Sequence, residues 1–242
     1  MPINGLFRIF LVTMSAGSLL FAACSQQPTS EVSTNAVTTN PTPNTVEVQQ
    51  STPQLKPMER QPDAEYVPAP QGTIEHAMKE VKIGKDDIVY DLGSGDGRIP
   101  ITAAKKFGAR GIGIEIDPQL VKKSNENAKK AGVSDKVKFI QQDIFKSDFS
   151  DATVVFLYLG EKINIQLRSQ LFKQLKPGTK VISLQHHMGD WVDYDDVDYF
   201  VCNPEDTCSQ EDRSSQIYFF TIPEKVPENL RVDVSKNFLA QK

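Results

Sequence analysis

From about residue 72 onward, hydrophobic and polar positions follow two patterns that alternate along the chain. Short apolar runs, which predict buried strands, alternate with stretches whose apolar positions recur every three or four residues, which predict amphipathic helices. The predicted strands are Asp87–Leu92, Gly111–Ile116, Lys136–Asp143, Ala152–Leu159 and Thr179–Gln185. Strands that alternate with helices through short loops form right-handed crossover units, so we expect a mainly parallel sheet covered by helices.

Helix signals lie before, between and after these strands. The best marked helix begins with Asp117 as N-cap and Pro118 in the first turn, and ends at Gly132. After Gln185 the pattern changes, because the strand-like runs at residues 196–201 and 215–222 have no helix between them. We therefore expect a single α/β domain, with a mainly parallel sheet that ends in an antiparallel C-terminal hairpin.

The first 24 residues have a pattern of their own. Arg8 precedes the apolar stretch Ile9–Ala23, which ends in small residues at Cys24. This stretch is shorter than the roughly 20 apolar residues of a membrane span and is typical of a signal peptide. Its ending, "LFAAC", resembles a bacterial lipobox, which implies a lipidated Cys24 and an exported, membrane-anchored protein. An ordinary membrane anchor, a signal cut without lipidation, and a cytoplasmic protein that does not use the signal are the alternatives.

Residues 25–65 are rich in Ser, Thr, Pro and Gln. Such a segment cannot bury enough apolar surface to offset the entropy of ordering, so it is expected to be a disordered linker. The domain is then expected over residues 66–230, followed by a tail over residues 231–242.

Composition limits the range of functions. The net charge of −4 over 242 residues supplies no general positive field for nucleic acid, which is therefore not the favoured partner. Cys202 and Cys208 flank a short polar loop, and either a disulfide or two separate thiols fit this spacing. No group of residues has the spacing of a metal site, and the oligomeric state is not predicted.

The loop "DLGSGDG" (Asp91–Gly97) follows the first predicted strand. It is not a phosphate-binding P-loop, because no lysine follows the glycines, and its G-x-G-x-G spacing differs from the G-x-G-x-x-G of dinucleotide sites. Asp91 and Asp96 would repel a pyrophosphate. The loop therefore favours a ligand that carries positive charge.

Two further acids lie at the carboxyl ends of the next two predicted strands, where an open parallel sheet binds its ligands. S-adenosylmethionine, with its ammonium and sulfonium groups, fits this arrangement. Asp91 would bind the ammonium, Glu115 the ribose hydroxyls and Asp143 the adenine amine. Ile116 and Ile144 would contact the adenine ring. The other cofactor contacts are expected from Gly93, Ser94, Gly95, Asp96 and Gly97.

With these motifs, residues 72–222 resemble the class I S-adenosylmethionine-dependent methyltransferases. "DLGSGDGRI" is closest to the branch of Dot1-like histone methyltransferases and of lysine methyltransferases of the ATP synthase c-subunit type. The resemblance implies a Rossmann-like domain and, by analogy, a protein lysine as one acceptor to consider. "YVPAP" (Tyr66–Pro70) resembles a segment that such proteins fold over the cofactor.

Residues on the acceptor side are expected after the fourth and fifth strands. Tyr158 would line the acceptor channel or pack on the sheet, and Glu161 would act as a base or attract a cation. His186 would act as a base near neutral pH, and at most one of His186 and His187 would face the site. "FLYLGEKIN" lacks the Asn/Asp-Pro-Pro-Tyr/Phe signature of methylation on adenine or glutamine amino groups.

Asp190 and Trp191, which follow the two histidines, would form either an acceptor pocket or a turn that stabilises the fold. Two functions stay open at this point. The chain is either an active methyltransferase whose acceptor is a protein side chain or a small molecule, or a catalytically inactive binding module of the cell envelope. The second is considered because S-adenosylmethionine is made in the cytoplasm, whereas the first 24 residues indicate export.

Overall fold

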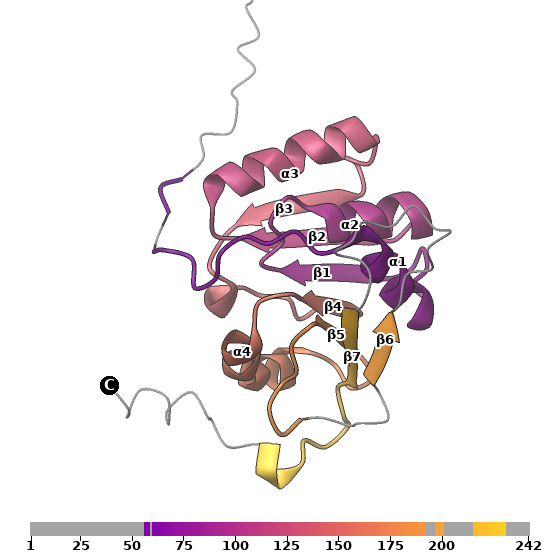
Figure 1. Ribbon diagram of the computed structural model, residues 1–242, viewed down its shortest axis with the longest axis vertical. Helices are drawn as coiled ribbons and strands as arrows, with labels where there is room; N and C mark the ends of the chain where they lie inside the picture. The colour runs from indigo at the N-terminus through magenta and orange to yellow at the C-terminus, as the bar shows by residue number, and fades with distance from the viewer. Residues whose placement is uncertain (1–55, 59, 192–196, 201–214, 231–242) are drawn as a thin grey trace, which may run out of the picture. The chain divides into compact units, whose positions relative to one another are not determined.

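The computed structural model describes residues 56–58, 60–191, 197–200 and 215–230 (Figure 1). The predicted signal peptide, the linker up to residue 55, the cysteine pair and the C-terminal tail lie outside these residues. Within the described residues, no helix has both the length and the apolar character that a membrane crossing requires.

A seven-stranded sheet forms the centre of the domain, with strand order β3-β2-β1-β4-β5-β7-β6 (Figure 1). The first five strands pair in parallel, and β7 pairs antiparallel with both β5 and β6. The predicted α/β fold with an antiparallel C-terminal hairpin is therefore confirmed. The strands are β1 (Ile88–Leu92), β2 (Arg110–Glu115), β3 (Val137–Gln141), β4 (Val154–Leu157), β5 (Lys180–Leu184), β6 (Val197–Phe200) and β7 (Ser215–Thr221).

Helix α1 (Gln71–Glu80) precedes the first strand. The helices between the parallel strands are α2 (Arg98–Thr102), which continues as the π-helix η1 (Ala103–Phe107), α3 (Pro118–Ala131) and α4 (Glu161–Gln174). Two 3₁₀ turns are η2 (Ile144–Lys146), between β3 and β4, and η5 (Glu228–Leu230), after β7. Helix α3 has the predicted ends: the Asp117 side chain accepts the Gln119 N–H at 2.7 Å, and Gly132 ends the helix with a φ of 72°.

The sheet is buried on both faces, and β4 shows why its sequence is a continuous apolar run. Val155 and Leu157 pack in the cluster that contains the buried residues of α4, whereas Val154 and Phe156 pack in the cluster that contains those of α1 and α2. Successive side chains of a strand point to opposite faces, so both sets must be apolar when helices cover both faces.

Strand β1 lies between β2 and β4 and is the point at which the strand order reverses. Its last residue, Leu92, pairs with Ile114 of β2 and with Leu157 of β4. The carboxyl ends of these strands therefore meet at one edge of the sheet, which is where open α/β sheets bind their ligands.

The structure differs from the predicted domain boundary at residue 66. The Lys56 N–H donates to Gln141 Oε1 at 3.0 Å, the Lys56 carbonyl accepts from Gln141 Nε2 at 2.6 Å, and Arg60 pairs with Asp143. The described residues between 56 and 65 thus belong to the domain. Hydrogen bonds and an ion pair, and not apolar burial, hold this segment against the domain. Its order could therefore not be predicted from hydrophobicity.

Gly97 begins α2 with a φ of 80°. A Cβ atom at this position would lie 2.6 Å from Phe139 Cζ and 2.9 Å from Ser124 Cβ. Gly97 is therefore required both by the left-handed backbone and by the close packing of α2 against β3 and α3.

We expect Gly97→Ala to lower the free energy of unfolding by roughly 2–4 kcal/mol, because backbone strain and overpacking add. Gly132→Ala is the matched control, since Gly132 also has a positive φ but nothing lies within 4 Å of its Cβ position. It should cost about 1 kcal/mol. Urea denaturation followed by circular dichroism measures both values, and equal losses would contradict the packing role of Gly97.

Candidate active site

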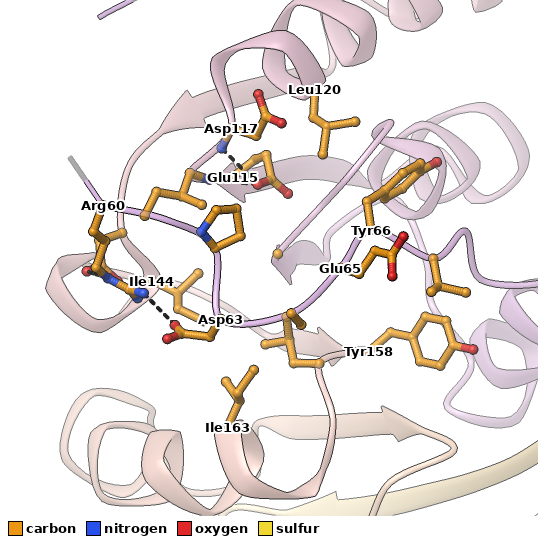
Figure 2. A pocket seen from close by; sticks show the side chains of 17 residues that line it. Arg60, Asp63, Glu65, Tyr66, Glu115, Asp117, Leu120, Ile144, Tyr158 and Ile163 are labelled. Carbon is orange, nitrogen blue, oxygen red and sulfur yellow. Dashed lines mark hydrogen bonds and ion pairs between the residues drawn. The ribbon is translucent and has the colours of Figure 1, made fainter. Parts of the chain in front are cut away.

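A cavity of about 190 Å³ opens at the carboxyl ends of β1, β2 and β4 (Figure 2). The segment that precedes α1 crosses in front of it, and we call residues 60–69 the strap. Strap residues that line the cavity are Arg60, Pro62, Asp63, Ala64, Glu65, Tyr66 and Val67. The cavity is therefore enclosed by the sheet edge behind and by the strap in front.

Glu115, the last residue of β2, is held by three backbone N–H groups. Gly95 donates to one carboxylate oxygen at 2.8 Å, and Ile116 and Asp117 donate to the other at 2.8 and 3.0 Å. A carboxylate accepts about four hydrogen bonds, so Glu115 keeps acceptor capacity at the cavity wall in a fixed orientation.

Asp91 in β1 has a different environment. Its side chain is buried, and none of the described residues donates a hydrogen bond to it. Burial, together with the charges of Glu115 and Asp96, raises the pKa of Asp91 well above its usual value. A buried carboxyl group in this situation favours a ligand that brings a positive charge to it.

Asp96, the second acid of the glycine loop, is already paired. Arg98 Nε and Nη2 donate to its two carboxylate oxygens at 2.9 and 2.8 Å. Burial raises the pKa of Asp96, but the hydrogen bonds and the charge of Arg98, together with a hydrogen bond from Tyr66, outweigh this effect and hold the pKa below its usual value. The two acids of the loop are therefore not equivalent, and Asp91 is the one without a cationic partner among the described residues.

Asp143 lies between β3 and η2 and has two sets of donors. It caps η2 by accepting the Phe145 N–H at 3.0 Å, and it pairs with Arg60 through Nε at 2.8 Å and Nη2 at 3.0 Å. The hydrogen bonds from Arg60 hold the pKa of Asp143 below its usual value, against the effect of burial.

The other end of the strap lies on the glycine loop. A Cβ at Gly95 would be 2.4 Å from Cε2 of Tyr66, so only glycine lets the tyrosine ring come this close. Arg98 Nη1 donates to the Ala69 carbonyl at 2.8 Å. Beneath this contact lies a second cavity of about 30 Å³, lined by residues of the strap and of the glycine loop.

The structure places most of the predicted cofactor residues at these two cavities. Those that line the larger one are Gly93, Glu115, Ile116, Asp143 and Ile144. Those that line the smaller one are Asp91, Gly93, Ser94, Gly95 and Asp96. Gly97 lines neither, in contrast to the expected cofactor contact, because it is packed between α2, β3 and α3.

Tyr158 follows β4 and lines both cavities. Its ring stacks on His186, with 6.3 Å between the ring centroids and 26° between the planes. Burial lowers the pKa of His186, an effect that the Glu161 carboxylate opposes and the neighbouring His187 reinforces. Tyr158 is thus at the wall of both cavities, and His186 is stacked against it without lining either.

Glu161 and His187 form a pair at the same end of the sheet. Their side chains approach within 3.5 Å, and His187 Nδ1 accepts the Gly189 N–H at 3.0 Å. Neither residue lines the two cavities. His186 and His187 do not lie on a strand, because β5 ends at Leu184 and Gln185 turns the chain with a φ of 67°. The alternation of side chains along a strand therefore does not decide which histidine faces the site.

For Asp190 and Trp191 the structure supports a stabilising turn. The buried Arg168 pairs with Asp190 and donates to the Met188 carbonyl at 3.1 Å. Trp191 packs between Phe172 and Phe220, at centroid distances of 4.4 and 4.8 Å. In the part of the chain that the structure describes, no three His, Cys, Asp or Glu side chains gather as a metal site would require.

Sequence reasoning missed the strap acids and Arg60. Asp63 and Glu65 line the larger cavity together with Arg60, although they lie in the segment that was expected to be disordered. The one signal near them was the resemblance of Tyr66–Pro70 to a segment that covers a cofactor.

Comparisons with known proteins agree with this geometry. The family model of the ANTKMT methyltransferase domain matches residues 91–195. A protein-lysine N-methyltransferase of Saccharolobus islandicus is 36% identical over 166 residues, which are 67% of this chain and 96% of that protein. The human lysine N-methyltransferase of the ATP synthase c-subunit is 34% identical over 142 residues, which are 59% of this chain and 60% of the human protein.

A solved structure is also similar. The crystal structure of an RNA methyltransferase from Salinibacter ruber with S-adenosyl-L-homocysteine has 48% sequence identity and a TM-score of 0.58, and the match covers 68% of this chain and 99% of that one. Fold and comparisons together define a class I S-adenosylmethionine-dependent methyltransferase. The chain belongs to the family that includes the S. islandicus protein-lysine N-methyltransferase. It is thus an enzyme, and not the inactive binding module that the sequence left open.

The environment of Asp91 leads to a prediction about stability and ligand binding. The pKa of Asp91 is higher in the folded state than in the unfolded state. Asp91 therefore lowers the stability of the protein as the pH rises from the unfolded-state pKa to the folded-state pKa. Asp91→Asn should therefore raise the melting temperature of the ligand-free protein at pH 7 by a few degrees. This gain in melting temperature should increase with pH until the pH exceeds the raised pKa of Asp91, and it should stay constant above that pH.

The same variant should bind S-adenosylhomocysteine at least tenfold more weakly, because the amide removes the negative charge that faces the ligand ammonium. Thermal melts between pH 5 and 8 and calorimetry with S-adenosylhomocysteine measure the two effects. A variant that is less stable than the wild type, or that binds as tightly, would contradict this description of Asp91.

Proposed function

We propose that this enzyme transfers a methyl group from S-adenosylmethionine to a lysine side chain of a protein. The observation that carries the proposal is the charge of the larger cavity. Among the described residues that line it, Arg60 is the single cation. Besides Glu115 and Asp143, which we assign to the cofactor, the lining carboxylates are those of Asp63, Glu65 and Asp117. Such a site attracts a lysine ammonium and repels a phosphate backbone.

The residues present fit the cofactor. In our proposal Asp91 accepts hydrogen bonds from the ammonium of the methionine moiety, which would compensate its buried charge. Glu115 uses its remaining acceptor sites for the ribose hydroxyls, and its three backbone donors support this role by fixing its orientation. Asp143 lies at the adenine end, where Ile116 and Ile144 supply apolar contacts. When bound, the cofactor supplies an electrophilic methyl group on a sulfonium.

The acceptor side is proposed to centre on Tyr158. A lysine nitrogen is protonated near neutral pH and must lose a proton before its lone pair can attack. His186 is suited to take up this proton through a water, because its lowered pKa keeps the imidazole neutral. The nitrogen then forms a bond to the methyl carbon, the carbon–sulfur bond breaks, and its electron pair stays on sulfur. Glu161 adds negative charge near the entering ammonium.

RNA is the second candidate acceptor, because the Salinibacter ruber relative is named an RNA methyltransferase. Helix α3 also presents the exposed lysines Lys122, Lys123, Lys129 and Lys130. None of these four lines the cavity, however, and the groups that do line it are mainly acidic. The charge at the site therefore favours the protein acceptor.

The acceptor class is tested by incubating the protein with methyl-labelled S-adenosylmethionine and, in separate reactions, a synthetic lysine-rich peptide and total RNA. We expect label on the ε-amino groups of the peptide and little on RNA. Label on RNA without label on the peptide would overturn the proposal.

His186→Gln should lower kcat/KM on the peptide by roughly a hundredfold at pH 7, the usual contribution of a positioned base. The rate of the variant should keep rising with pH, because lysine then loses its proton without help, whereas the wild-type rate should level off at lower pH. His76→Gln is the control, since His76 lies on α1 and pairs with Asp198, away from the cavities. Parallel pH profiles for wild type and His186→Gln would rule out the base role.

We also propose that the enzyme is an exported lipoprotein anchored to a membrane through Cys24. The support is the apolar stretch Ile9–Ala23 and the "LFAAC" ending. Cells that express the full chain are labelled with palmitate and then fractionated. Wild type should carry the label in the membrane fraction and Cys24→Ala should not. If wild type and Cys24→Ala distribute equally between the fractions and neither carries palmitate, the lipid anchor is refuted.

A further inference from the structure

The strap is attached to the domain at its two ends. At the C-terminal end, the Tyr66 ring covers Gly95, Arg98 binds the Ala69 carbonyl, and α1 follows directly. At the N-terminal end, Arg60 pairs with Asp143, and among the described residues this is the one ion pair between the strap and the rest of the domain. The N-terminal end is also held by the two hydrogen bonds between the Lys56 main chain and the Gln141 side chain. The Arg60–Asp143 pair is therefore the charged part of this attachment, whereas the C-terminal end combines packing with a main-chain contact.

The geometry of the Arg60 contact is that of a strong ion pair. Its two hydrogen bonds, at 2.8 and 3.0 Å, reach different oxygens of Asp143, so the guanidinium and carboxylate meet in a bidentate arrangement. The Asp143 side chain is 4% exposed and the Arg60 side chain 34%. The Arg60 guanidinium also lies 5.8 Å from the centre of the Phe145 ring and forms an ion pair with Asp63 within the strap.

This pair has two consequences for the cavity. The carboxylate of Asp143 already accepts three hydrogen bonds, two from Arg60 and one from Phe145, which leaves about one acceptor site for a ligand. The pair also holds the strap in front of the cavity, which Figure 2 shows between Arg60 and Tyr66. Movement of the strap would therefore widen the entrance to the cavity for a ligand of the size of S-adenosylmethionine.

We propose that Arg60 is a further cofactor-site residue, which controls cofactor exchange by holding the strap closed through Asp143. When the pair breaks, the strap loosens between its attachments at Lys56 and at Tyr66 and Ala69, and the adenine end of the cavity is uncovered. Arg60 acts through Asp143 and the strap, so it is a positioning residue and not a catalytic one. The inference rests on the proposed placement of the cofactor in this cavity.

The test compares the full-length wild type with Arg60→Gln, which keeps a polar side chain but removes the ion pair. Release of labelled S-adenosylhomocysteine into an excess of unlabelled ligand should be roughly fivefold faster in the variant, as expected for a partly exposed bidentate pair. Association should also be faster, because closure opposes entry and exit alike. The Kd should therefore change less than either rate.

Glu75→Gln is the matched control, because it removes the ion pair between Glu75 and Lys106, which line neither cavity, and leaves Arg60 paired with Asp143. Its release rate should stay close to that of the wild type. Salt gives a second readout that a purely structural role would not change. Release from the wild type should become faster as KCl screens the pair, whereas release from Arg60→Gln should depend little on salt.

Two results would overturn the inference, and they can be told apart. If Arg60→Gln and the wild type release S-adenosylhomocysteine at the same rate with the same salt dependence, while Asp91→Asn and Glu115→Gln lose the ligand, the role of Arg60 fails and the cofactor placement stands. If Asp91→Asn and Glu115→Gln both bind as tightly as the wild type, the placement fails and the role of Arg60 fails with it.

Discussion

The buried carboxyl group of Asp91 beside Glu115 is the feature on which the rest of the site depends. Parallel strands bring their carboxyl ends to one edge, so acids that lie far apart in sequence come together in a small volume. Glu115 is stabilised by three backbone N–H groups, whereas no described residue donates to Asp91. The fold thus retains a destabilising group that a cationic ligand would compensate.

The same arrangement separates charge within the domain. Acids line the cavity, and the exposed lysines of α3 lie outside it. The one cation among the described residues at the cavity, Arg60, is already paired with Asp143 and Asp63, so it adds little net positive charge for a phosphate. A cationic acceptor therefore fits the site better than a polyanion, although the net charge of the whole chain is only −4.

Much of the fold was predictable because its signals are local. The apolar run of β4 reflects burial on both faces, and Asp117, Pro118 and Gly132 set the ends of α3 through contacts within the helix. The glycine loop, Glu115 and Asp143 could be singled out because each lies at the end of a strand or just after it. The packing role of Gly97 was not predictable, since its contact with Phe139 joins the start of α2 to a strand more than 40 residues further along.

The sequence by itself determined the order of strands and helices, the position of the acids at the strand ends and the class of ligand, because periodicity and strand ends are properties of neighbouring residues. Only the tertiary structure decided that residues 60–69 close the cavity. Arg60 finds Asp143 across 83 positions of sequence, and an ion pair between distant residues leaves no periodic pattern. A polar segment that ion pairs keep ordered has the same sequence pattern as a disordered polar segment, because hydrophobicity predicts burial and does not predict which charged residues pair.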